Sequence, residues 1–144
     1  MPKFSSGSTR DYYDGSREKF LNKGFPGFEI CLEMMRKNDP QMQEDGFFLL
    51  GPHAAEFLDR LLAEFYRLEN DSLQYWLIEL IGKAKSPAAF PFLVEQLYSA
   101  DESLRYWAIR GLKELDTKEA RTILWQARSF KFDAEEETRR FQAD

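Results

Sequence analysis

The sequence contains very little of the chemistry on which most enzymes and metal sites depend. It has one cysteine, Cys31, and one histidine, His53, among 144 residues. A single cysteine excludes an internal disulfide framework and favours a reducing compartment, and the two residues are too few for a structural zinc site. No glycine-rich phosphate loop of either common pattern occurs. We therefore expect a protein that is not an enzyme and that uses no metal or cofactor.

Long apolar runs are missing as well. Runs such as Phe47–Leu50 fall far short of the ~20 residues that cross a bilayer. Residues 1–10 lack the apolar stretch of a secretory signal peptide. These features predict a cytoplasmic protein without a membrane partner.

Positive charge is scarce in the middle of the chain. The net charge is −5, and residues 25–100 alone carry six basic and twelve acidic groups. Binding to a phosphate backbone depends on Lys and Arg, so this distribution argues against a nucleic-acid partner. It suits a basic protein partner, and it is equally compatible with acids that only keep the protein soluble.

What the sequence does contain is a repeated segment. The stretch NDSLQYWLIELIG starts at Asn70, and DESLRYWAIRGLK starts 31 residues later at Asp101. Five positions of the two copies are identical: Ser72, Leu73, Tyr75, Trp76 and Ile78 match Ser103, Leu104, Tyr106, Trp107 and Ile109. A fixed period of this length is typical of helical repeat proteins, in which neighbouring units stack into one continuous core.

The repeated unit is predicted to be a helix, a short turn and a second helix. In the first copy, Asp71 or Ser72 caps a helix that ends at Gly82, and Ser86 caps a helix over 86–98 that has Pro87 in its first turn. The second copy repeats this over 102–115 and 117–128. Further upstream, the apolar spacing predicts a helix that stops at Pro40, a helix that ends near Gly51 and a helix over 54–68. We expect three helix pairs preceded by one helix.

These residues resemble the HEAT-like repeats, particularly their short bacterial form. Its pattern of acidic, aliphatic-Arg, Ala and Leu positions is met by Asp101, Leu104, Arg105, Ala108 and Leu112. The resemblance covers about residues 40–128 well and 25–39 loosely. It implies an all-α fold, an α/α superhelical solenoid. We divide the chain into a flexible or short-helical lead over 1–24, with a short helix at Ser16–Leu21, a repeat domain over 25–128 and a capping helix over 129–144.

The resemblance implies a non-catalytic protein-binding module. The most specific interpretation is an immunity or inhibitor protein, either a monomer or a heterodimer with a basic partner such as a toxin domain. A scaffold or adaptor subunit is the alternative. HEAT-like repeats also occur in bilin lyases, whose activity is enzymatic, and in alkylpurine DNA glycosylases, which the acidic middle opposes.

Two sets of residues are candidates for binding a partner. The second helices of such repeats line the inner surface. Their outward positions form an acidic stripe of Glu29, Glu33, Glu56, Asp59 and Glu95, accompanied by Tyr98, that ends in a basic patch at Arg121, Gln126 and Arg128. Trp125 falls off the buried stripe of its helix and is either covered by Phe130, Phe132 and Phe141 or exposed as an anchor. The two Tyr-Trp pairs either pack between repeats or form an exposed aromatic ladder.

Overall fold

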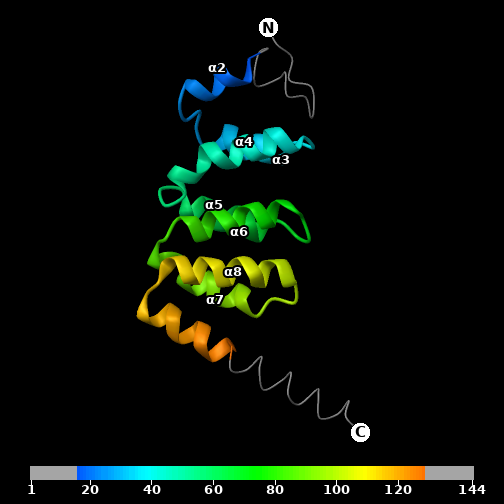
Figure 1. The fold of residues 1–144 in the computed structure, drawn as a ribbon. Helices are drawn as coiled ribbons and strands as arrows, with labels where there is room; N and C mark the ends of the chain where they lie inside the picture. Colours follow the sequence, from blue (N-terminus) through cyan, green and yellow to red (C-terminus); the bar gives the residue numbers. More distant parts are fainter. Residues whose placement is uncertain (1–15, 129–144) are drawn as a thin grey trace.

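Every regular element that the structure describes is a helix. The computed structural model describes residues 16–128, which contain no strand (Figure 1). The all-α fold expected from the sequence is therefore confirmed. The elements in chain order are α2 (Arg17–Asn22), α3 (Phe28–Arg36), α4 (Pro40–Leu50), η1 (Gly51–His53), α5 (Leu58–Arg67), α6 (Leu73–Lys83), η2 (Pro87–Ala89), α7 (Phe90–Leu97) and α8 (Glu102–Leu115), followed by a helical segment over residues 118–128.

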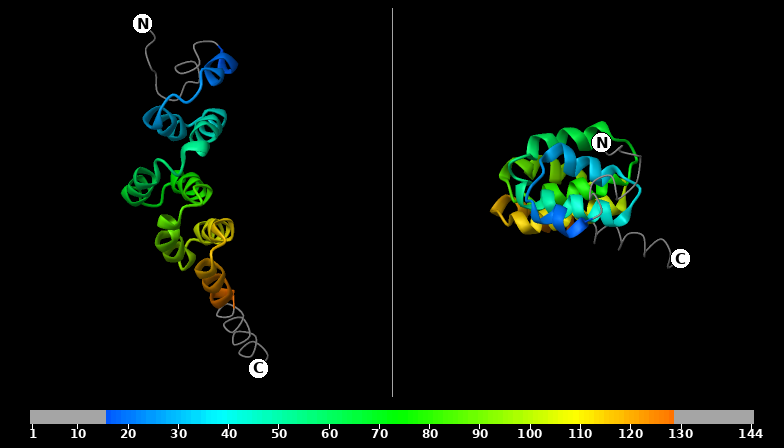
Figure 2. Two further views of the ribbon diagram at one scale, coloured as in Figure 1. Left: turned by 90° about the vertical axis from the view of Figure 1, so that its left-hand side faces the viewer. Right: turned by 90° about the horizontal axis from the view of Figure 1, so that it is seen from above.

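The helices stack in layers of two along one axis. The layers are α3 with α4, α5 with α6, and α7 with α8. The turned view in Figure 2 shows two rows that run down this stack, with α3, α5 and α7 in one and α4, α6 and α8 in the other. The 118–128 segment continues the stack beyond α8, and α2 lies at the opposite end. This arrangement is the expected solenoid.

The pairing of the helices differs from the sequence-based expectation by one helix. The sequence interpretation joined 73–82 with 86–98, whereas α5 packs against α6 and α7 packs against α8. The connection over 84–89 instead carries the chain from one layer to the next. The length of a two-helix period is the same whichever helix is taken as the first of the unit. The period alone therefore cannot tell which neighbouring helices form a layer.

Most predicted helix starts are confirmed by capping contacts. The carboxylate of Asp101 accepts hydrogen bonds from the backbone N–H groups of Ser103 and Leu104, and Ser86 Oγ accepts one from Ala88. Such side-chain acceptors satisfy backbone donors that have no partner within the first turn.

Pro40 and Gly82 do not have the roles that the sequence suggested. Pro40 starts α4, with Asp39 as its cap, instead of only ending the preceding helix. The helix containing Gly82 continues to Lys83, and Lys85 takes the left-handed conformation at φ 49°. Gly82 is buried against α8, so packing and not termination explains it.

The core runs without a break from α3 to the 118–128 segment. Residues with no exposed surface include Cys31, Leu50, Leu77, Leu112 and Ala120, one from each of five helical segments. Burying such a continuous apolar strip between layers is the main favourable term in the stability of a stacked repeat.

The short helix expected at 16–21 is present as α2, with Ser16 Oγ accepting a hydrogen bond from the Lys19 N–H. A bidentate contact joins α2 to α4. Arg17 Nε and Nη2 donate to the two carboxylate oxygens of Asp45 at 2.5 and 2.7 Å, and Asp45 is only 3% exposed. The rest of the 1–24 lead, and the 129–144 helix with Phe130, Phe132 and Phe141, lie outside the described residues.

Candidate functional site

The residues of the predicted acidic stripe lie along one row of the stack. Glu29 and Glu33 come from α3, Asp59 from α5 and Glu95 from α7, which follow one another in the same row (Figure 2). Glu56 lies in the turn before α5, because that helix begins at Leu58 and not near residue 54 as predicted. The residues selected from the sequence therefore lie along one row of the structure. Their use in binding stays a prediction.

Two of the stripe acids have strong cationic partners within the protein. Glu29 forms an ion pair with Arg60 of α5, and Glu33 contacts Arg36 at 3.6 Å and Lys37 at 3.3 Å. Such exposed pairs contribute little to stability, but they neutralise charge that a partner would otherwise meet.

The other three acids keep more of their charge for a partner. Glu56 lies 3.3 Å from His53 Nδ1, and Glu95 accepts a 2.8 Å hydrogen bond from the hydroxyl of Tyr66. Asp59 has no ion pair within residues 16–128. Within the stripe, the negative charge without a Lys or Arg partner is therefore that of Glu56, Asp59 and Glu95.

Exposed aromatic rings accompany these acids. Tyr66 and Tyr98 are both exposed, Tyr66 next to Glu95 in space and Tyr98 three residues beyond it at the end of α7. Trp125, for which the sequence left both coverage and exposure open, is 71% exposed. Tyrosine and tryptophan are the residues most often found at the centres of protein interfaces.

The two Tyr-Trp pairs are neither a fully buried core nor an exposed ladder. Tyr75, Trp76 and Trp107 are half-buried, whereas Tyr106 is 51% exposed. The Tyr75 hydroxyl donates a 2.6 Å hydrogen bond to Asp101, which holds the pKa of that carboxyl below its usual value. No ring contact joins one pair to the other in the described part of the chain, since Trp76 contacts Phe47 and Trp107 contacts Tyr106.

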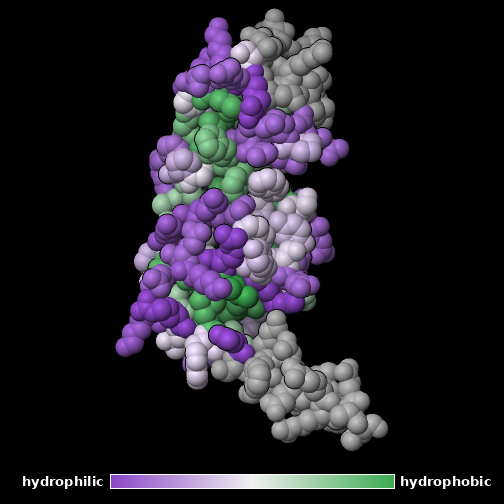
Figure 3. All heavy atoms as spheres, in the orientation of Figure 1, coloured by the Kyte–Doolittle hydropathy of each residue, from purple (hydrophilic) through white to green (hydrophobic). Residues whose placement is uncertain are grey.

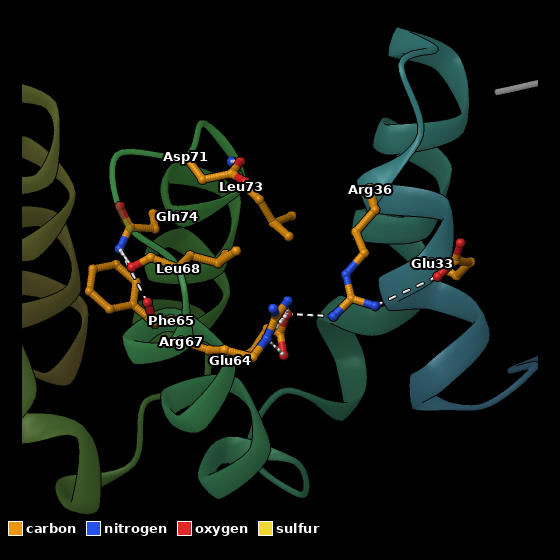
Figure 4. Close-up of polar contacts among 9 residues, drawn as sticks. All are labelled: Glu33, Arg36, Glu64, Phe65, Arg67, Leu68, Asp71, Leu73 and Gln74. Carbon is orange, nitrogen blue, oxygen red and sulfur yellow. Dashed lines mark hydrogen bonds and ion pairs between the residues drawn. The ribbon is translucent and has the colours of Figure 1, made fainter. Parts of the chain in front are cut away.

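An ion-pair network that the sequence did not reveal joins the first two layers. Arg36 reaches from α3 to Glu64 on α5, and Glu64 also accepts hydrogen bonds from Arg67 (Figure 4). Hydrogen bonds from Arg67 and Arg36 hold the pKa of Glu64 below its usual value. The contact spans 28 residues, so it depends on how two layers stack and leaves no local pattern in the sequence.

The depressed pKa of Glu64 makes stability depend on pH in a defined direction. A carboxyl group that is more acidic in the folded state stabilises the fold above its unfolded pKa, near 4.5, and the benefit is lost as pH falls through the lower folded value. We expect the melting temperature to fall less between neutral pH and pH 3 in Glu64→Gln than in the wild type. An identical pH profile for both proteins, measured by circular dichroism, would contradict this. Glu69→Gln, an exposed change in the next loop, is the control.

Trp76 lies between two hollows where the first layer meets the second. The larger, of about 770 Å³, is lined from α4 by Glu44, Phe47 and Phe48, from α6 by Trp76, Glu79 and Lys83, from α8 by Glu114, and from the connecting segments by Gly51, Pro52 and Lys85. We call it the aromatic groove. The smaller, of about 370 Å³, includes Arg36 and Arg67. The adjacent Phe47 and Phe48 were the only sequence signal for the groove, and nothing local placed them beside Trp76.

Cys31 and His53, the single cysteine and the single histidine of the chain, lie in separate elements, α3 and η1. Burial raises the pKa of the Cys31 thiol to about 12, so it stays protonated and is a poor nucleophile. The His53 ring stacks on Phe25 with ring centroids 3.9 Å apart. Across residues 16–128 no group of three His, Cys, Asp or Glu side chains is arranged to hold a metal ion.

Comparison with known proteins decides the family. A model of HEAT repeats matches residues 58–139, more than half of the chain. The chain belongs to the HEAT repeat family. The HEAT match begins at Leu58, the first residue of α5, so the family model starts at the beginning of a structural layer. No curated protein and no solved structure matches the chain. Among the described residues, no helix has the length and apolar character needed to cross a membrane.

Proposed function

We propose that this protein is a non-catalytic binding module for a basic protein partner, which docks on the row formed by α3, α5 and α7. HEAT repeats generally mediate protein–protein interaction. A stacked repeat suits this role because successive helices present one extended surface to a partner.

The observation that carries the proposal is that Glu56, Asp59 and Glu95 lie along this row and that two exposed tyrosines, Tyr66 and Tyr98, accompany Glu95. None of the three acids has a Lys or Arg partner within the described residues. Tyr66 and Tyr98 flank Glu95 and offer large apolar contact area with a polar end. Acids around aromatic anchors are the arrangement expected of a surface that attracts a basic protein and then holds it.

The most specific form of this proposal is an inhibitor or immunity protein that forms a 1:1 complex with a basic toxin domain. The support is the chain's size, its net charge of −5 and the charge distribution described above. Toxins that act on nucleic acids carry basic surfaces, because they must neutralise phosphates. Covering such a surface with carboxylates would block the toxin without any catalysis.

Charge reversal at the three acids tests the proposal. The triple variant Glu56→Lys, Asp59→Lys and Glu95→Lys is expected to slow association with a partner captured from a native lysate by at least about tenfold at low salt. The difference should shrink at high salt, since exposed charges act mainly on association and are screened. Stopped-flow or surface-plasmon measurements over a salt series give these rates.

A second triple variant controls for net charge. Glu18→Lys, Glu69→Lys and Glu102→Lys make the same charge change at exposed positions outside this row. This variant should associate much faster than the stripe variant. Equal slowing by both triples would mean that only net charge matters, and unchanged kinetics in the stripe variant would exclude this row as the binding surface.

A further inference from the structure

The aromatic groove lies on the opposite row from the acidic stripe and has a chemistry of its own. Phe48 of α4 lines it and is 69% exposed, and the rings of Phe47 and Trp76 line it with their centroids 5.0 Å apart. Figure 3 views this row and shows hydrophobic surface at the level of α4, above a hydrophilic band at the level of α6. The groove therefore joins apolar and charged surface at the seam between two layers.

Aromatic rings on this row already bind cations of the chain itself. The Lys83 ammonium lies 5.2 Å from the centre of the Phe47 ring, and Arg110 lies 5.9 and 5.5 Å from the rings of Tyr106 and Trp107. These distances are within the range in which a ring face attracts a cation. Among the described residues, no cation lies over Phe48 or Trp76. Two rings of the groove are thus not paired with a cation of the described chain.

Glu79 supplies a carboxylate at the same place. It is half-buried on α6, and in the described structure it accepts no hydrogen bond and has no ion pair within 4 Å. Burial raises the pKa of the Glu79 carboxyl, and the more distant positive charges of Lys83 and Arg110 lower it in part. A carboxylate that has lost water without gaining a donor is a site where a bound cation recovers the lost solvation.

The lining as a whole favours a cation over an anion. Three carboxylates, Glu44, Glu79 and Glu114, line the groove against the two ammonium groups of Lys83 and Lys85, and Lys83 is already placed over Phe47. A purely apolar occupant would cover Glu79 without giving it a donor, which is unfavourable. Phosphate-bearing ligands would meet an excess of negative charge.

We infer that the aromatic groove receives an arginine side chain of the basic partner, with the guanidinium between Trp76 and Phe48 and hydrogen-bonded to Glu79. Arginine fits better than lysine because its guanidinium is planar, less strongly hydrated and able to stack on a ring while donating in its own plane. The inference rests on the proposed function in one respect, namely that the partner is basic. It adds a second contact surface, on the row that the acidic stripe does not use.

A short arginine peptide tests the groove without the natural partner. The probe is Ac-Gly-Ser-Arg-Leu-Ser-Gly-amide, titrated into the isotopically labelled full chain while the indole N–H signal of Trp76 is followed by NMR. We expect saturable movement of the Trp76 signal. Replacing arginine by citrulline, its neutral isostere, should weaken binding about fivefold or more, because the cation–π and charged hydrogen-bond contributions are lost.

Three variants locate the binding site. Glu79→Gln and Phe48→Ala should each weaken peptide binding about fivefold. Neither threatens the fold, since a glutamine side chain keeps the shape of the glutamate that it replaces and Phe48 is largely exposed. Glu102→Gln, an exposed change on α8 that does not line the groove, is the matched control and should change affinity less than about twofold.

Several results would overturn the inference. The first is equal affinity for the arginine and citrulline peptides. The others are an unchanged NMR signal of the Trp76 indole, or signal changes confined to residues of α3, α5 and α7. The outcome is independent of the acidic stripe. If the stripe variant associates normally with the captured partner while the peptide still fills the groove, the proposed docking row is wrong and the groove assignment stands. If the stripe variant fails to associate and the peptide does not bind, only the groove assignment falls.

Discussion

Replacing Gly82 with alanine is expected to destabilise the protein by about 1–3 kcal/mol, although alanine is the better helix former by about 1 kcal/mol. A Cβ atom at Gly82 would lie 3.0 Å from the Cα atom of Gly111. The neighbouring atom belongs to the backbone of α8, so it cannot move aside as a flexible side chain would. The helices α6 and α8 would have to separate, and the core between two layers would open with them.

Two other glycines make this prediction specific. Gly51 lies 31 positions before Gly82, at the equivalent point of the repeat, yet a Cβ atom there would meet nothing within 4 Å. Gly51→Ala should therefore leave stability unchanged or raise it by up to about 1 kcal/mol. Gly111→Ala should also destabilise the protein, because a Cβ atom there would lie 3.2 Å from the Cα atom of Gly82 and 2.9 Å from a methyl group of the buried Leu93.

Urea denaturation of the three variants measures the differences. Gly82→Ala should lower the midpoint without changing the slope, because the two folded proteins bury similar surface. An effect of equal size in Gly51→Ala would mean that backbone freedom, and not the close approach of α6 and α8, explains the glycine.

The contrast between these glycines shows where sequence reasoning succeeds in this protein. Helix positions and caps follow from neighbouring residues, so Ser86 could be assigned as a cap from the sequence and is confirmed. The role of Gly82 depends on a residue 29 positions away in another layer. A glycine after an apolar run is the usual signal for a helix end, and only the close packing of α8 against α6 overrides that expectation.

The candidate site likewise has some features that the sequence predicts and others that it does not. The row of the acidic stripe could be predicted, because the side of a helix on which a residue lies follows from its spacing. The neutralisation of Glu29 could not, since Arg60 comes from the next layer. The aromatic groove needed three helices and a turn to meet, and nothing in the repeat distinguishes a ring that lines a hollow from one that packs against a helix.

Equivalent positions of the two repeat copies also differ in how much space they have. Leu77 on α6 and Ala108 on α8 are 31 residues apart and both completely buried. The HEAT-like pattern favours alanine here, and only the second copy follows it. The reason lies in the packing of α8, which contacts both α6 and α7 closely, whereas α6 has only slight contact with α4 in the layer above. The wider spacing above α6 is consistent with a larger side chain.

Leu77→Ala is accordingly expected to lower the free energy of unfolding by about 2–5 kcal/mol, the usual cost of removing a buried leucine when its surroundings cannot collapse into the cavity. The reverse change, Ala108→Leu, should cost about 1–3 kcal/mol through overpacking. Lys113→Ala, an exposed change on α8, should stay within about 0.5 kcal/mol. Calorimetric unfolding of the three variants compares these costs. If Ala108→Leu were tolerated as well as Lys113→Ala, the two copies would have equal space, and the difference between leucine and alanine at this position would not reflect the closer packing of α8.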